Sequence, residues 1–176
     1  VTRIILTHAH PDHAGGAHEM VERTAAPGVA VHVDDASYVR AGTNPPRDLT
    51  TGSGRLFQRF SKGTFAAAAV DRELADGEML DVAGGLRVIH TPGHTPGHVA
   101  LLHEPTGVLI TGDSIFNMGA RRTWPFAAFC TSFAQTKQTA AVLADLDYRV
   151  AAFTHGPEIS ESAREQIRRF LSSNDA

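Results

Sequence analysis

The residues best suited to chemistry in this sequence form a short cluster near its beginning. His8, His10, Asp12 and His13 directly follow the apolar run of residues 1–6. Neutral imidazole and carboxylate groups are ligands for zinc and other first-row metals, and close spacing lets one loop supply several of them. A polar loop that is merely rich in His is the alternative, but His-x-His-x-Asp-His at the end of a strand favours metal binding. The first hypothesis is therefore a metal site.

Three further short motifs follow this cluster along the chain. They read TPGHTPGH at residues 91–98, TGD at residues 111–113 and THGP at residues 154–157. Each is weak evidence alone, but four motifs in a fixed order are specific. Together with residues 7–13, they resemble the metal-binding motifs of the metallo-β-lactamase superfamily.

This resemblance implies an α/β fold, a four-layer αββα sandwich with a metal centre in the cleft at one edge of its two sheets. It also implies two divalent metal ions as cofactors, with zinc expected and manganese or iron as alternatives. The residues at the matching positions are His8, His10 and His94 for one metal, Asp12, His13 and His155 for the second, and Asp113 as the bridging carboxylate.

The chemistry that such a ligand set implies is hydrolysis. A bridging Asp113 would hold two ions at the roughly 3.5–4 Å spacing of two-metal hydrolases, and the pair would lower the pKa of a shared water toward neutrality. The bridging hydroxide would be the nucleophile, and Asp12 could orient it by hydrogen bonding, so Asp12 and Asp113 are the predicted catalytic residues. Since the set resembles that of glyoxalase II and the lactonases, the expected substrate is a small ester, thioester or lactone.

Two residues exclude neighbouring chemistries within the family, and two alternatives stay open. Asp113 stands where true β-lactamases generally carry Cys or Ser, and His10 stands where flavodiiron proteins carry Glu. One alternative is a mononuclear iron persulfide dioxygenase of the same fold, in which His8, His94 and Asp113 supply a two-His, one-carboxylate site. The other is a non-catalytic or incomplete module.

The beginning of the chain departs from the family pattern. Family members usually have several strands before the first metal motif, whereas seven residues precede His8. We therefore expect an N-terminally shortened domain: the sequence begins inside it, another chain supplies the strands, or the fold is reduced. A sheet without those strands would expose an edge that invites pairing, which predicts either a homo-oligomer or an isolated chain that is unstable.

Length and composition are typical of one soluble domain covering residues 1–176. The chain is 42% hydrophobic and 20% charged, and its net charge of −3 gives no reason to expect nucleic acid or an anionic membrane as partner. Cys130 is the only cysteine, so it forms no intrachain disulfide and is expected to be a small buried residue. No run approaches about 18 apolar residues. A cytoplasmic enzyme acting on a small molecule is the expectation.

The elements that must position the motifs alternate between strands and helices, and every candidate ligand comes just after a strand. Asp34 or Asp35 is expected to cap a short helix that ends at residue 40, and Ser132 and Ser162 to cap the last two helices. Residues 42–63 are expected to be a loop with a short helix or lid at 55–63 that contacts substrate, or only packs. His98 is expected to orient a ligand or to be structural, and His32, His90 and His103 are not expected to be ligands. Strands are predicted at residues 1–6, 29–33, 86–90, 99–103, 108–111 and 150–153, and the longer helices at residues 17–23, 132–146 and from 162 onward.

Overall fold

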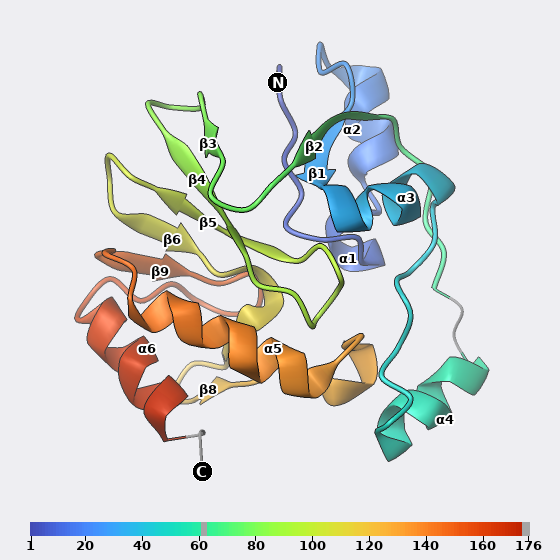
Figure 1. The fold of residues 1–176 in the computed structure, drawn as a ribbon. Helices are drawn as coiled ribbons and strands as arrows, with labels where there is room; N and C mark the ends of the chain where they lie inside the picture. The colour runs from blue at the N-terminus through green and yellow to red at the C-terminus, as the bar shows by residue number, and fades with distance from the viewer. Residues whose placement is uncertain (61–62, 174–176) are drawn as a thin grey trace.

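The computed structural model describes residues 1–60 and 63–173, and its N-terminal half places helices against a two-stranded sheet (Figure 1). The two strands pair in parallel. The first of them is Val-Ala-Val-His with all four residues buried, as expected of a β-branched run that is covered on both faces. The elements of this half are α1 (Pro11–Ala14), α2 (Ala17–Arg23), β1 (Val29–His32), α3 (Val33–Ala41) and β2 (Val70–Leu74).

Two predictions for this half are wrong. Residues 1–6 do not form a full strand, because only their last part lies beside β1, through a single bridge between Ile5 and Ala30. Neither Asp34 nor Asp35 caps α3. The N-cap is His32, whose Nδ1 accepts the Asp34 N–H at 3.3 Å, and the Asp35 side chain is buried among other groups.

The second sheet has five strands in the order β3, β4, β5, β6, β9. The first four pair antiparallel in sequence, and β9 joins the edge beside β6 in parallel. The strands predicted at residues 99–103 and 108–111 are confirmed and pair antiparallel. The strands are β3 (Met79–Leu80), β4 (Leu86–His90), β5 (Val99–His103), β6 (Val108–Ile110) and β9 (Val150–Ala152).

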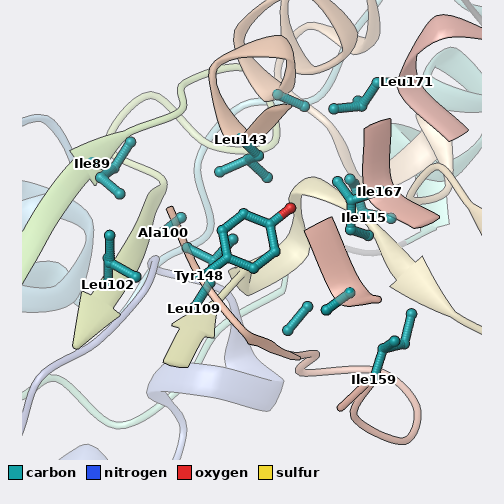
Figure 2. Packing of buried hydrophobic residues seen from close by; sticks show 13 residues of the cluster. Ile89, Ala100, Leu102, Leu109, Ile115, Leu143, Tyr148, Ile159, Ile167 and Leu171 are labelled. Carbon is teal, nitrogen blue, oxygen red and sulfur yellow. The ribbon is translucent and has the colours of Figure 1, made fainter. Parts of the chain in front are cut away.

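The five-stranded sheet is buried on both faces, which makes the molecule four layers thick. Side chains alternate between faces along a strand, so Leu101 packs toward the two-stranded sheet with Ala30, while Leu102 packs toward the C-terminal helices (Figure 2). A third cluster lies between β1 and the N-terminal helices. The order helix, sheet, sheet, helix confirms the predicted sandwich.

The outer helical layer on the C-terminal side consists of α5 (Phe133–Ala140) and α6 (Ala163–Ser172). The Ser132 side chain accepts the Gln135 N–H, which confirms the predicted cap, but α5 ends earlier than predicted and continues as the 3₁₀ turn η3 (Ala141–Ala144). Ser162 precedes α6 without a side-chain cap bond. Its φ of 49° lies outside the extended conformation that lets a cap oxygen reach the helix N–H groups.

The remaining elements are short and lie at the edge where the loops meet. The predicted short helix of the 42–63 segment is α4 (Gly52–Phe60), while residues 61–62 lie outside the described part of the chain. The segment after Asp113, for which no helix or strand is predicted, contains small elements. They are η1 (Gly112–Ser114), β7 (Phe116–Asn117), β8 (Arg122–Thr123) and η2 (Ala127–Phe129). None of the helices described here is long and apolar enough to span a membrane.

Candidate metal centre

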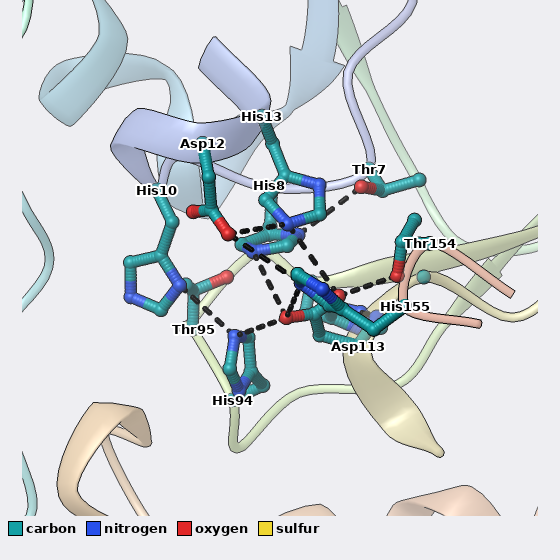
Figure 3. Close-up of polar contacts among 12 residues, drawn as sticks. Thr7, His8, His10, Asp12, His13, His94, Thr95, Asp113, Thr154 and His155 are labelled. Atoms are coloured by element: carbon teal, nitrogen blue, oxygen red, sulfur yellow. Dashed lines mark hydrogen bonds and ion pairs between the residues drawn. The ribbon is translucent and has the colours of Figure 1, made fainter. Parts of the chain in front are cut away.

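The first motif is a loop that leads from the extended N-terminal segment into α1 (Figure 3). His10 is the N-cap of α1 and Pro11 its first residue, a position where the missing N–H of proline costs nothing. His13 therefore lies on the single turn of α1, close to His8 in the preceding loop, with ring centroids 4.0 Å apart. The local sequence thus converges several side chains on one point.

His94 joins His8 and His10 in a buried group of three imidazoles. Ligand atoms of these residues all lie within 4.8 Å of one another, and His10 Nδ1 is 2.9 Å from His94 Nε2. His8 is fully buried and His94 nearly so. The Nδ1 atom of His94 lies 3.5 Å from the Cys130 thiol, which leaves Nε2 to face the group.

Asp12, His13 and His155 form a second group on the more open side of the centre. His13 Nε2 and His155 Nε2 each lie 3.4 Å from Asp12 Oδ2. The side chains of Asp12 and His155 are 59% and 38% exposed. The two groups therefore differ in burial, since the first faces the interior and the second faces solvent.

Asp113 lies between the two groups. Its Oδ2 is 3.2 Å from His94 Nε2 and 3.5 Å from His155 Nε2, and its Oδ1 is 3.5 Å from His13 Nε2. The Thr154 hydroxyl donates a 2.5 Å hydrogen bond to Oδ1 and fixes the carboxylate (Figure 3). All seven predicted side chains are thus brought together, with Asp113 facing both groups.

The protonation states fit a cation in this position. Burial first, then the neighbouring His94, lowers the pKa of His10 to about 3, and burial with the surrounding imidazoles lowers the pKa of His8 strongly. Burial alone would raise the pKa of Asp113, but the hydrogen bond and charge of His94 hold it well below its usual value. Neutral imidazoles at His8 and His10 beside the ionised Asp113 carboxylate are the donor state that metals require.

Unpartnered nitrogen atoms give a second test of fit. His8 Nε2 and His13 Nε2 are buried and have no hydrogen-bond partner among the described residues. A buried polar atom without a partner costs about 1–3 kcal/mol, and two of them in one cluster call for a group that they can bind. A divalent cation is such a group, so the residues present fit a metal.

His98 positions Asp113 without belonging to either group. Its fully buried ring accepts the Asp113 N–H at Nε2, 2.7 Å away, while Nδ1 lies 2.8 Å from the Thr91 hydroxyl and 3.1 Å from the Thr91 carbonyl. An acceptor at Nε2 requires the proton on Nδ1, which donates to Thr91. Gly112 allows this contact, because a Cβ there would lie 2.5 Å from His98 Nε2. This geometry agrees with the predicted orienting role.

Asp35 is the residue that sequence reasoning missed. Its buried carboxylate accepts the Ala9 N–H at 2.8 Å, the Thr95 hydroxyl at 2.6 Å and the Gly97 N–H at 2.7 Å. It therefore ties the loop of the first motif to the loop of the second. Burial raises the pKa of Asp35, since desolvation outweighs these hydrogen bonds. The available signal was an Asp just past the end of a predicted strand, as at the other motifs.

His32, Asp34 and His90 form a separate cluster near the same loop. The rings of His32 and His90 are stacked, with centroids 3.8 Å apart and planes at 17°. His32 Nδ1 accepts the Asp34 N–H, and His90 Nε2 lies 2.9 Å from the Pro96 carbonyl oxygen, to which it can donate. These bonds cap α3 and hold residues 91–98. His103 contacts Thr106 and the Ala83 carbonyl, away from the centre.

A cavity of about 390 Å³ opens above the two groups. The candidate ligands His10, Asp12, His94, Asp113 and His155 form its floor. Its walls come from the predicted 42–63 segment and from the segment after Asp113. They contain Asn44, Arg47, Phe116, Phe126 and Phe129.

Known proteins resemble this chain in sequence and in fold. Residues 1–155 match the family model described as the metallo-beta-lactamase superfamily. The probable metallo-hydrolase YybB of Bacillus subtilis is 26% identical over 159 residues, 89% of this chain and 64% of YybB. The hydroxyacylglutathione hydrolase of Cereibacter sphaeroides is 34% identical over 123 residues, 69% of this chain and 37% of that enzyme. The crystal structure of a metallo-beta-lactamase family protein from Thermus thermophilus gives a TM-score of 0.71 at 28% identity, covering 98% of this chain and 60% of that one. The chain spans less than two thirds of each.

Proposed function

The chain belongs to the metallo-beta-lactamase superfamily, and from this membership we propose that it is a zinc-dependent hydrolase that uses two metal ions to cleave a small ester, thioester or lactone. One observation carries the proposal: the Asp113 carboxylate lies within 3.5 Å of ring nitrogens from both ligand groups. A carboxylate in that position can be shared by two cations. One relative is named a hydroxyacylglutathione hydrolase, which makes an acylated thiol a candidate substrate here.

The roles of the residues follow from their burial. When bound, two divalent cations would lower the pKa of a water and polarise the carbonyl group under attack. The buried imidazoles exclude solvent beneath the reacting atoms, while Asp12 stands at the open side. The neighbouring His13 ring, whose Nε2 lies 3.4 Å from Oδ2, lowers the pKa of Asp12, so its carboxylate is ionised and can orient the attacking water. The proposed ligands are His8, His10 and His94 for one ion, Asp12, His13 and His155 for the other, and Asp113 for both.

A second candidate function rests on a smaller set of residues. His8, His13 and Asp113 also have ligand atoms within 4.8 Å of one another, a two-His, one-carboxylate set of the kind that holds a single ferrous ion in oxygenases. The persulfide dioxygenase alternative is predicted to use His8, His94 and Asp113, so this set has His13 in place of His94. It leaves the group of Asp12 and His155 without a role, so the hydrolase is the preferred assignment.

Elemental analysis of the purified protein tests the proposal. We expect close to two zinc ions per chain, with hydrolysis of esters, thioesters or lactones that is lost on chelation and restored by zinc. Asp113→Ala should lose at least one ion and most of the hydrolysis while the fold persists. Asp147→Ala is the matched control, because the Asp147 side chain is 97% exposed. A single iron with oxygen uptake on a glutathione persulfide, or two ions and full activity in Asp113→Ala, would overturn the assignment.

A further inference from the structure

The cavity above the metal centre has one cationic wall. Arg47 is the only Arg or Lys among the described residues that line it. No carboxylate in the described part of the chain forms an ion pair with this guanidinium, although the side chain is partly buried. A desolvated cation without an anionic partner is costly, and burial lowers the pKa of Arg47. The Arg47 guanidinium can therefore bind an anion from outside the protein, such as a group of the substrate.

The Arg47 side chain is held in place. Its Nη1 donates to the Ala128 carbonyl at 2.7 Å, and the guanidinium carbon lies 5.2 Å from the centre of the Phe129 ring and 6.0 Å from that of Phe57. Stacking of a guanidinium on aromatic rings leaves its edge free to bond in its own plane. The remaining N–H groups are therefore oriented before any ligand arrives.

The backbone around Arg47 is fixed to the same neighbouring segment. The Asp48 N–H donates to the Cys130 carbonyl at 2.7 Å, and the Thr131 hydroxyl donates to the Pro46 carbonyl at 2.8 Å. Cys130 in turn contacts the His94 ring. The position of Arg47 is thus coupled by short contacts to the floor of the metal centre, which limits how far the two can drift apart.

Aromatic rings complete the cavity wall and reach the candidate ligand His155. Phe116 is buried and its ring centroid lies 4.5 Å from that of His155. Phe126 packs 6.4 Å from Phe116 and 6.3 Å from Phe129 in edge-to-face contacts. Phe126 and Phe129 are nevertheless 66% and 40% exposed. Exposed aromatic rings that are grouped at a cavity mark a surface that binds apolar groups.

We propose that the substrate carries both a carboxylate, bound by Arg47, and an aromatic or bulky apolar group, bound by Phe116, Phe126 and Phe129. This assignment rests on the proposed hydrolase function and narrows its substrate class. Charge-assisted hydrogen bonds to guanidinium are short and directional, and the cavity volume of about 390 Å³ suits a small molecule of this kind.

Binding of a non-hydrolysable probe tests the carboxylate site without requiring activity. The probes are 3-phenylpropionate and its neutral amide, titrated calorimetrically into metal-loaded protein with the metal content of each variant measured. We expect Arg47→Met to weaken binding of the carboxylate by roughly 10- to 100-fold with little change for the amide, and Arg47→Lys to restore part of the affinity. Arg55→Met is the matched control, because Arg55 is exposed and outside the cavity.

Steady-state hydrolysis then separates this inference from the hydrolase assignment. With the monophenyl ester of glutaric acid, Arg47→Met should raise KM roughly 10-fold and change kcat by less than about 2-fold. With the phenyl ester of glutaramic acid, in which an amide replaces the free carboxylate, Arg47→Met should change neither KM nor kcat. If both esters are cleaved but the Arg47 variants match Arg55→Met, the inference is overturned and the hydrolase stands. If neither ester is cleaved while probe binding depends on Arg47, the hydrolase assignment fails and the pocket assignment stands.

The aromatic wall is tested by Phe126→Ala, which changes an exposed side chain and should leave the fold intact. Wild-type protein should bind 3-phenylpropionate roughly 10-fold more tightly than propionate, and the variant should lose most of that preference. Met118→Ala, which removes another exposed apolar side chain outside the cavity, should not. Equal preference in wild-type and Phe126→Ala protein would remove the apolar half of the proposal.

Discussion

Replacing Asp35 by Asn tests whether the two loops that carry the metal ligands depend on one buried carboxylate. Both carboxylate oxygens are in use: Oδ2 accepts from Ala9 and Thr95, and Oδ1 accepts from Gly97. An amide has a single acceptor oxygen. If that oxygen replaces Oδ2, the amide NH₂ points at the Gly97 N–H, and that buried donor loses its partner. The protein has little room to relax, since a Cβ on Gly97 would lie 2.9 Å from the Asp35 carboxyl carbon.

The magnitude follows from the number of donors that lose a partner. One buried N–H without a partner costs about 1–3 kcal/mol. The raised pKa of Asp35 shows that desolvation of the carboxylate offsets part of the hydrogen-bond energy, so we take the middle of this range. Asp35→Asn should therefore lower the free energy of unfolding by about 2 kcal/mol, and Asp35→Ala, which leaves three donors unpaired, by about 4 kcal/mol.

The assay is urea denaturation of metal-loaded and chelated protein, combined with a zinc affinity measurement by competition with a chromophoric chelator. For a chain of this length, about 2 kcal/mol corresponds to a drop in Tm of roughly 4–8 °C. Zinc affinity should fall as well, because the segments that carry His8 and His94 are no longer tied together. Asp34→Asn makes the same charge change on a half-exposed side chain and should stay within about 0.5 kcal/mol of wild type. An Asp35→Asn protein as stable as Asp34→Asn, with unchanged zinc affinity, would refute the role assigned to Asp35.

Two further outcomes are expected. Metal-free protein should lose stability as the pH falls below about 6.5, because His10 and His98 have folded-state pKa values of about 3 and so take up protons only on unfolding. Each of these histidines lowers the free energy of unfolding by up to about 1.4 kcal/mol per pH unit. A urea denaturation midpoint that is constant between about pH 7 and pH 4 would contradict this. Gly112→Ala should lower the free energy of unfolding more than Gly77→Ala. Both glycines have a positive φ, 55° and 73°, but only the Cβ at residue 112 meets a neighbour, His98 Nε2. We expect a difference of about 2 kcal/mol between the two variants in urea denaturation, and equal losses would show that backbone strain alone requires the glycine.

The candidate ligands could be predicted because each motif encodes its own position. His8, His10 and Asp12 are close in sequence, so their convergence needs only one loop, and His94, Asp113 and His155 each follow an apolar strand. Strand ends at one edge of a sheet meet regardless of how the rest of the fold is arranged. The four layers could likewise be predicted from the resemblance, and the alternation of buried residues on the five-stranded sheet bears it out.

Asp35 was missed because its hydrogen bonds are long-range. Local reasoning assigns an Asp before a helix to a cap, and the Asp34-Asp35 pair satisfies that pattern. In the structure Asp35 bonds to Ala9, 26 residues away, and to Gly97, 62 residues away. The strand predicted at residues 1–6 failed for a related reason, since pairing depends on how much of a neighbouring strand is available, which composition alone does not encode.

The side chains that form the cavity walls could not be predicted from the local sequence either. The 42–63 segment was expected either to contact substrate or only to pack. Which of its side chains turn inward could not be predicted from periodicity, because the part containing Arg47 is irregular. Its orientation is set by hydrogen bonds to residues 128–131, a segment that also lacked a predicted element.

The two ligand groups are buried to different extents, so the metal centre has a buried side and an exposed side. The imidazole of His8 is enclosed by protein and that of His94 is almost fully buried at the cavity floor, whereas Asp12 and His155 are more exposed and line the cavity together with Arg47. A buried donor set cannot rearrange to admit substrate, because each nitrogen is fixed by packing, so substrate must approach from the exposed side. The groups that could select a substrate therefore lie on that side. His98 and Thr154, which support Asp113 through hydrogen bonds, lie beneath it. Specificity can consequently change through residues 42–63 and 116–129 without disturbing the hydrogen bonds that hold the metal ligands.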